Sequence, residues 1–122
     1  MTIQELYAEI GGNYEHALKI MKMDKMINRY ILKLKSSHVY EELMKAGETL
    51  DPKAMFESAH AMKGVCANLG LDTLSDAASD IAEEFRPGNE RKHSDDEVRE
   101  MLASITGMYR RVDEGITKDE NS

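Results

Sequence analysis

Apolar residues recur at helical spacing along nearly the whole chain, and this pattern decides the fold class. Gaps of four and three residues separate the apolar positions between residues 52 and 69, which are Met55, Ala59, Met62, Cys66 and Leu69. Gaps of three and four also separate the next set, which is Leu71, Leu74, Ala78, Ile81 and Phe85. Such spacing places apolar side chains on one face of an α-helix. Because strand-type alternation is hard to find, we predict an all-α fold.

Helix-starting and helix-ending residues divide the first part of the chain. A short helix is expected over residues 2–10, where a glycine pair follows it, and a second over residues 13–21, with Asn13 as its N-cap. Asp24 is the expected N-cap of a long helix, which continues to Ala46-Gly47 with a bend near Ser36-Ser37.

The second part of the chain carries clearer boundary signals. Asp51 followed by Pro52 predicts the start of a helix, because proline fits the first helical position, where no N–H is needed. We expect Gly70 to end this helix and Arg86-Pro87-Gly88-Asn89 to break the next one. Ser94 and Glu97 form a capping box at the start of the last helix, which is expected to reach about Ile116.

Four long amphipathic helices joined by short links predict an antiparallel up-down-up-down four-helix bundle, with the short N-terminal helices capping one end. A length of 122 residues suits one domain. We therefore expect a single domain over residues 1–122, with a bundle core at about 24–116 and a polar, frayed tail at 117–122. The starting methionine and this polar tail favour a free-standing protein.

Charge and composition exclude several functional classes. The net charge of −7 argues against binding to nucleic acid and to an anionic membrane surface, both of which require a basic face. No apolar run is long enough to cross a bilayer, and the N-terminus does not resemble a secretory signal. The single cysteine, Cys66, excludes an internal disulfide, so the expected location is the cytoplasm.

One segment of the second long helix, predicted over residues 52–69, does not fit a plain bundle. At about 100° per residue, His60, Lys63, Gly64 and Ala67 fall together on the face opposite the apolar stripe. A glycine inside a helix costs about 1 kcal/mol relative to alanine. Close packing against another helix is one explanation of Gly64, but its predicted face is solvent. We therefore expect a partner molecule to approach the backbone beside His60.

The chemistry of an exposed imidazole narrows the function. Histidine has an ordinary pKa of about 6.5, so an exposed ring is largely neutral at cytoplasmic pH. A neutral imidazole is a nucleophile that can carry a phosphoryl group. The helix crowds Nδ1, which leaves Nε2 as the natural site. Lys63, one turn later, is placed to meet phosphoryl oxygens, with an effect of only about 1 kcal/mol in water.

These residues suggest a family. The string His60-Ala61-Met62-Lys63-Gly64, continuing to Ala67-Asn68-Leu69-Gly70, resembles the core of histidine-containing phosphotransfer (HPt) domains. Those domains use a His-x-x-Lys-Gly core that is often followed by Ala-Asn-Leu-Gly-type residues. The resemblance extends over about residues 12–112 and includes the order and lengths of the helices. Met62 stands where a leucine is more usual.

The resemblance implies a phosphorelay intermediate that is not an enzyme and binds no nucleotide. His60 would accept a phosphoryl group from a receiver-domain aspartate and pass it to an aspartate on another receiver. The implied partners are receiver domains or a hybrid histidine kinase, and the receiver supplies the acidic pocket and Mg²⁺, so no cofactor or metal is expected on this chain. A monomer is expected. The implied docking and phosphate-binding residues are Phe56, Glu57, Lys63, Gly64, Ala67 and Asn68.

Several alternatives remain open on the sequence alone. Phe56 is either an exposed contact for a receiver or partly buried by a neighbouring helix, and Asn68 either orients the imidazole or helps to end the helix. The main alternative function is a helical interaction module that docks receiver domains without being phosphorylated. A metal-dependent hydrolase is disfavoured, because the sequence shows no cluster of metal ligands. The other histidines, and the acidic pairs Glu41-Glu42, Glu83-Glu84 and Asp95-Asp96, are expected to be incidental surface or capping residues.

Overall fold

The computed structural model describes residues 1–121 and is helical, with no strand within that range. This confirms the predicted all-α class. The elements are α1 (Ile3–Ile10), α2 (Tyr14–Met21), α3 (Asp24–Lys33), the 3₁₀ helix η1 (Lys35–Ser37), α4 (Val39–Thr49), α5 (Pro52–Asn68), α6 (Asp72–Phe85) and α7 (Asp95–Glu120).

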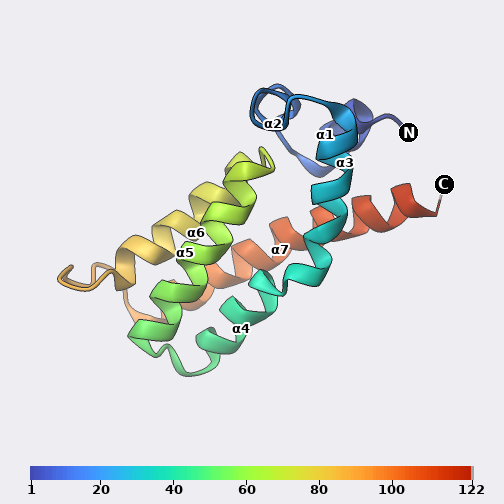
Figure 1. Ribbon diagram of the computed structural model, residues 1–122. Helices are drawn as coiled ribbons and strands as arrows, with labels where there is room; N and C mark the ends of the chain where they lie inside the picture. The colour runs from blue at the N-terminus through green and yellow to red at the C-terminus, as the bar shows by residue number, and fades with distance from the viewer. Residues whose placement is uncertain (122) are drawn as a thin grey trace.

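The helices form a bundle in which α5 and α6 have the most extensive contact. Helix α4 packs on the other side of α5, and α7 runs behind them in contact with both α6 and α4 (Figure 1). Helices α1 and α2 lie at one end of the bundle, where α1 contacts α7 and α2 contacts α5. The outer side of α5, facing the viewer in Figure 1, is left without a covering helix.

The apolar stripes predicted for α5 and α6 are buried in the core. All ten predicted positions, from Met55 to Phe85, are at most 5 % exposed. Burial raises the pKa of the Cys66 thiol to about 12, so this cysteine is a core residue and a poor nucleophile. The burial of one face fixes the rotation of α5, and with it the direction in which the opposite face points.

The first long helix is not continuous as expected. Helix α3 ends at Lys33, η1 follows, and His38 adopts a left-handed backbone conformation with φ of 59° before α4 begins. The hydroxyl groups of Ser36 and Ser37 donate hydrogen bonds to the carbonyl oxygens of residues 33 and 34. Because these bonds compete with the helical ladder, the expected bend is a full break between two helices.

Three other boundary predictions are wrong. Met23, not Asp24, is the N-cap of α3. Helix α4 passes through Gly47 and ends at Thr49. Gly47 does not end the helix but allows close packing, because a Cβ on it would lie 2.7 Å from the Cδ1 atom of Leu102. Residues 117–120, expected to be frayed, continue α7 and are held by an ion pair of 2.8 Å between Lys118 and Glu9. Ser122 lies outside the described residues.

Glu84, expected at the surface, is buried at the end of α6 and holds the link to α7. Its Oε2 atom accepts hydrogen bonds from the Arg91 guanidinium and from the backbone N–H groups of Lys92 and His93, at 2.9–3.1 Å. The His93 ring lies 2.9 Å from Oε1. Burial by itself raises the pKa of Glu84, but these hydrogen bonds outweigh it and lower the pKa to about 2.

We predict that Glu84→Gln lowers the free energy of unfolding by roughly 2 kcal/mol at pH 5.5–6, because an amide cannot accept all of these charge-assisted hydrogen bonds. Because the pKa of Glu84 is lowered in the folded state, its contribution to the free energy of unfolding is fully present above pH 4.5. That contribution is lost as the pH falls toward 2. Hydrogen bonding to Glu84 raises the pKa of His93 above 6.5, so the His93 contribution is present below pH 6.5 and is lost at higher pH.

Urea denaturation across this pH range measures the effect. The difference between the wild type and Glu84→Gln should be widest between about pH 4.5 and 6.5. Glu90→Gln, in the exposed loop that follows α6, is the control and should leave stability unchanged. An equal, pH-independent loss in both variants would contradict this explanation.

Candidate functional site

His60 lies in the middle of α5 and is exposed, as predicted. The helix starts where Asp51 and Pro52 predict it, and the Asp51 carboxylate accepts a hydrogen bond from the N–H of Ala54 at 3.0 Å. Met55, Ala59 and Met62 are fully buried on the opposite face. The helix is thus anchored at its start and along one side, and the imidazole projects from the side without a covering helix.

Gly64, one turn after His60, is exposed and open. A Cβ atom built on it would meet no atom within 4 Å outside its immediate neighbourhood. Packing against another helix, the alternative explanation of this glycine, is therefore excluded within residues 1–121. Bare backbone lies beside the imidazole, and nothing in the described chain occupies the space above it.

Lys63 lies on the same helix and contacts α6 through its backbone. It is half-buried, and its backbone carbonyl accepts a hydrogen bond from the Ser75 hydroxyl at 3.1 Å. Its charge acts on Glu83 of α6: the Arg86 guanidinium is the main cause of the lowered pKa of Glu83, and Lys63 adds to it. The ammonium group of Lys63 is therefore close enough to Glu83, on the next helix, to act on it electrostatically.

For Phe56 the structure shows the second of the two alternatives, partial burial. It is partly buried against the core, and its ring stacks on the imidazole of His60 with centroids 5.6 Å apart and planes inclined by 22°. The guanidinium carbon of Arg86 lies 5.3 Å from the centroid of the Phe56 ring. Arg86 and Glu83 were missed as site residues, although a cation three residues after an acid, near the end of the neighbouring helix, was visible in the sequence.

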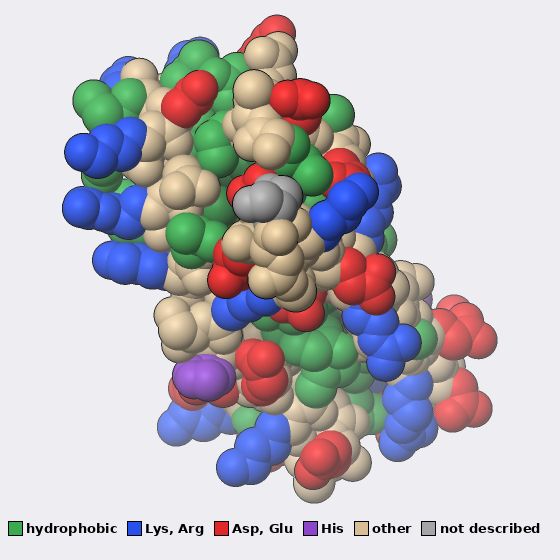
Figure 2. Space-filling view, turned by 90° about the vertical axis from the view of Figure 1, so that its right-hand side faces the viewer, with side chains coloured by type: hydrophobic (Ala, Val, Ile, Leu, Met, Phe, Trp, Pro, Cys, Tyr) green, Lys and Arg blue, Asp and Glu red, His purple; other side chains and the backbone are tan. Residues whose placement is uncertain are grey.

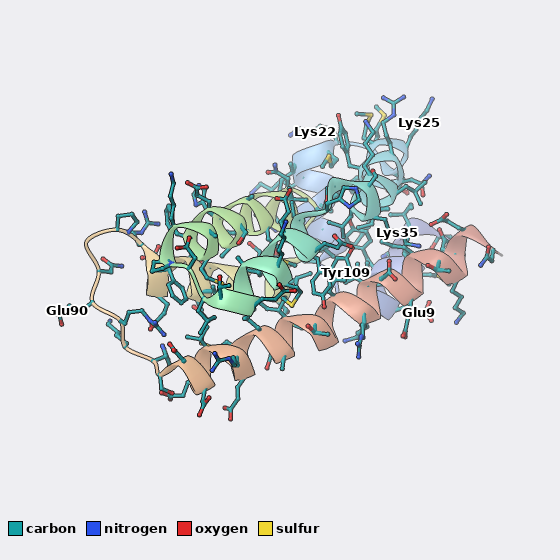
Figure 3. All side chains as sticks on the ribbon, turned by 90° about the horizontal axis from the view of Figure 1, so that it is seen from below. Glu9, Lys22, Lys25, Lys35, Glu90 and Tyr109 are labelled. Atoms are coloured by element: carbon teal, nitrogen blue, oxygen red, sulfur yellow. The ribbon has the colours of Figure 1, made fainter. Side chains whose placement is uncertain are left out.

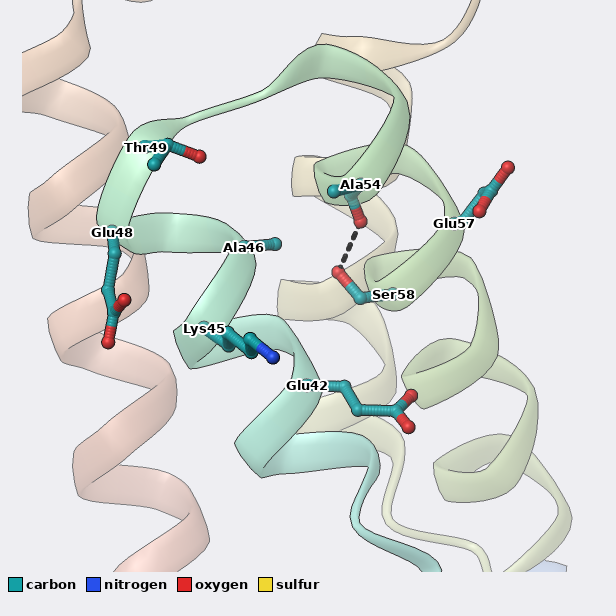
Figure 4. A pocket seen from close by; sticks show the side chains of 8 residues that line it. All are labelled: Glu42, Lys45, Ala46, Glu48, Thr49, Ala54, Glu57 and Ser58. Carbon is teal, nitrogen blue, oxygen red and sulfur yellow. Dashed lines mark hydrogen bonds between the residues drawn. The ribbon is translucent and has the colours of Figure 1, made fainter.

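The remaining predicted residues border this face. Glu57 and Asn68 are exposed, and Ala67 is half-exposed. Glu57 lines an open groove of about 470 Å³ between α4 and α5, together with Glu42, Lys45 and Ser58 (Figure 4). Asn68 lines a second groove of about 590 Å³, formed with α2 and α3. The two grooves lie near opposite ends of α5, and His60 lies between them along the helix.

Two of the three other histidines, His16 and His93, have structural partners that the sequence did not reveal. The His16 ring lies 2.7 Å from the Asp72 carboxylate, which joins α2 to α6, and His93 pairs with Glu84. Within the described range, no group of three His, Cys, Asp or Glu side chains is arranged to hold a metal ion. None of the helices described is long and apolar enough to span a membrane.

Comparison with known protein families identifies a matching family model. The family model described as Hpt domain matches residues 28–115, which include α4, α5, α6 and most of α7. The segment with His60, Lys63 and Gly64 lies inside the matched range, whereas α1 and α2 lie outside it. Searches of curated proteins and of solved structures returned no significant match.

Proposed function

The chain belongs to the Hpt domain family, and from this premise we propose that it carries a phosphoryl group on His60 between the aspartates of two receiver domains. Members of this family serve phosphotransfer in two-component signalling, act as phosphocarrier modules rather than enzymes, and interact with receiver and kinase components. The finer proposal assigns the donor, the acceptor and the residue that carries the group.

The observation that carries this proposal is the exposed imidazole beside open backbone at Gly64. A neutral imidazole attacks the phosphorus of an aspartyl phosphate through the lone pair of Nε2. The N–P bond forms, the P–O bond to the aspartate breaks, and its electron pair returns to the carboxylate. Transfer to the second receiver runs the same steps in reverse. A receiver can bring its phosphoaspartate into contact with the imidazole only if the surface beside His60 is free of protruding side chains.

The surface around α5 supports docking of an acidic partner. A set of exposed cations on α2, on α3 and at the link between them, here called the cationic edge, consists of Lys19, Lys22, Lys25, Arg29 and Lys33. Figure 2 shows Lys and Arg side chains along one edge beside hydrophobic ones, and in Figure 3 Lys22 and Lys25 point away from α7. The cationic edge borders the groove that contains Asn68, and its charge would attract the acidic pocket of a receiver over the Debye length of about 8–10 Å.

Lys63 is expected to tune the transfer rather than to be indispensable. A charge pair at about 5 Å in water contributes about 1 kcal/mol, so Lys63→Ala should lower the single-turnover transfer rate about three- to tenfold. Lys63→Arg keeps the charge and should retain most of the rate. Rapid-quench measurement of phosphoryl transfer from a labelled receiver checks this, and complete loss in Lys63→Ala would contradict a tuning role.

The remaining assignments follow from the same proposal. The receiver holds the Mg²⁺ that transfer requires, and this chain needs no cofactor of its own. We propose a cytoplasmic monomer, because the exposed face of α5 is assigned to the receiver. We also propose one domain with an antiparallel up-down-up-down bundle built from α3–α4, α5, α6 and α7, which the short links and the pairwise packing of successive helices support.

The direct test is transfer of radiolabel from a phosphorylated receiver domain to the wild-type chain. Acid-labile, base-stable label on the chain supports the proposal, since phosphohistidine has this stability. Binding of the receiver without label would instead support the alternative, an interaction module that is never phosphorylated.

A further inference from the structure

Three side chains from two helices form a continuous stack that ends at the His60 ring. Phe56 and His60 stand four residues apart on α5, so their side chains share one face. Their rings are stacked, with a centroid separation of 5.6 Å, inside the range of about 4.5–7 Å typical of favourable ring pairs. The guanidinium carbon of Arg86, at the C-terminal end of α6, lies 5.3 Å from the Phe56 centroid.

The position of Arg86 is set by its backbone. Asn89 donates its N–H to the carbonyl of Arg86 at 3.0 Å, and Gly88 has a positive φ of 92°. With proline as second residue and glycine as third, residues 86–89 match a type II β-turn. Pro87 also restricts Arg86 to extended backbone, observed at φ −60° and ψ 130°. The turn that ends α6 thus determines where the arginine side chain starts.

Glu83 fixes the other end of the same arginine. Its Oε1 atom accepts hydrogen bonds from both Nε of Arg86, at 3.0 Å, and Nη2, at 2.6 Å, and its Oε2 atom accepts another from Nε at 3.2 Å, so that two nitrogens restrain the guanidinium. The Asn89 side chain in turn donates to the carbonyl oxygen of Glu83 at 3.0 Å. The arginine is therefore held from its backbone and from its charged end, and its position over the Phe56 ring follows from both.

We infer that Phe56, held by Arg86 and Glu83, is a positioning residue that sets the orientation of the His60 imidazole. This inference rests on the proposed function of His60 and adds how that site is kept ready. An exposed histidine on a helix otherwise samples several χ1 and χ2 rotamers. Stacking on the Phe56 ring, which is itself held in place, disfavours the rotamers in which the imidazole no longer lies over that ring. This selects which imidazole nitrogen faces the incoming phosphorus.

Orientation matters because phosphoryl transfer is governed by alignment. The attacking nitrogen, the phosphorus and the leaving oxygen must come roughly into line at contact distance, and a displacement of about 1 Å can lower a rate a hundredfold. A loosened ring still reacts, but only in the fraction of time in which it points correctly. Loss of the stack should therefore slow the transfer step without weakening the binding of the receiver.

The experiment compares Phe56→Leu, which keeps an apolar side chain but removes the ring, with Phe56→Tyr, which restores a ring. Arg86→Ala removes the cation, and Arg99→Ala is the matched control, because Arg99 also pairs with an acid three residues away but lies on α7. Two quantities are measured on the full chain: the tautomer and line width of the His60 ring nitrogens by NMR, and the single-turnover transfer rate at saturating receiver.

We expect Phe56→Leu to lower the saturated rate about five- to tenfold, with a half-saturating receiver concentration unchanged within about twofold, and to alter the His60 ring signals. Phe56→Tyr should restore both, and Arg86→Ala should show the same changes to a smaller extent. Unchanged ring signals in Phe56→Leu would overturn the inference. So would a loss confined to the half-saturating concentration, since Phe56 would then be a receiver contact. The NMR comparison needs no phosphorylation, so it decides the positioning role even if the wild-type chain takes up no label.

Discussion

His60→Gln is expected to abolish the acid-labile, base-stable label that the wild-type chain acquires from a phosphorylated receiver. Glutamine keeps a polar side chain of similar reach but has no ring nitrogen with a free lone pair, so no N–P bond forms. The ring of His60 is exposed and makes no hydrogen bond to the described chain, so its removal should leave the thermal midpoint within about 2 °C of the wild type. Label transfer followed by acid and base treatment measures the first effect, and circular dichroism measures the second.

His38 provides the matched control for this variant. It is also exposed, but it lies between η1 and α4 in a left-handed backbone conformation, which asparagine tolerates. His38→Asn should therefore be labelled as well as the wild type. Label that persists in His60→Gln would place the phosphoryl group elsewhere and refute the assignment of His60.

Gly64→Gln should lower the rate of phosphoryl transfer and raise the stability of the fold. The added side chain occupies the open space beside His60 and would hold the receiver away from the imidazole, so the transfer rate should fall about a hundredfold. Glutamine is a better helix former than glycine, so the free energy of unfolding should rise by about 0.5–1 kcal/mol. Single-turnover transfer and urea denaturation measure the two effects on the same preparation.

A second exposed glycine makes this test specific. Gly107 lies inside α7, and a Cβ on it would likewise meet nothing within 4 Å. Gly107→Gln should gain similar stability and transfer at the wild-type rate. If Gly64→Gln transfers normally, the backbone beside His60 is not a contact surface, and the proposed mode of docking is wrong.

Local signals in the sequence predicted the part of the molecule that presents His60. Asp51-Pro52 and the Ser94–Glu97 capping box begin their helices as expected, because each satisfies or removes N–H groups within a few residues. The buried stripe of α5 was equally clear, and once that face is buried the direction of His60 follows. These features depend on residues close together in the chain, and a single sequence contains that information.

Features that depend on distant residues were not predictable in this way. Glu84 looks like a surface acid until the chain returns at Arg91 and His93 to supply its donors. Arg86 looks like a helix-ending residue until α6 is placed against α5 and the guanidinium lies over Phe56. One local feature was predicted only in part: the break after Lys33 was expected as a bend, because serine hydroxyls compete with the helical ladder without always interrupting it.

The packing of α1 against α7 brings the two ends of the described chain together. The terminal amine of Met1 lies 3.8 Å from the carboxylate of Asp119, and both ends of the ribbon emerge on the same side of Figure 1, away from the middle of α5. A fluorescent reporter or a surface tether attached at either end would therefore stand clear of the imidazole. Immobilised or dye-tagged forms of this protein should accept the phosphoryl group from a receiver at the same rate as the untagged chain.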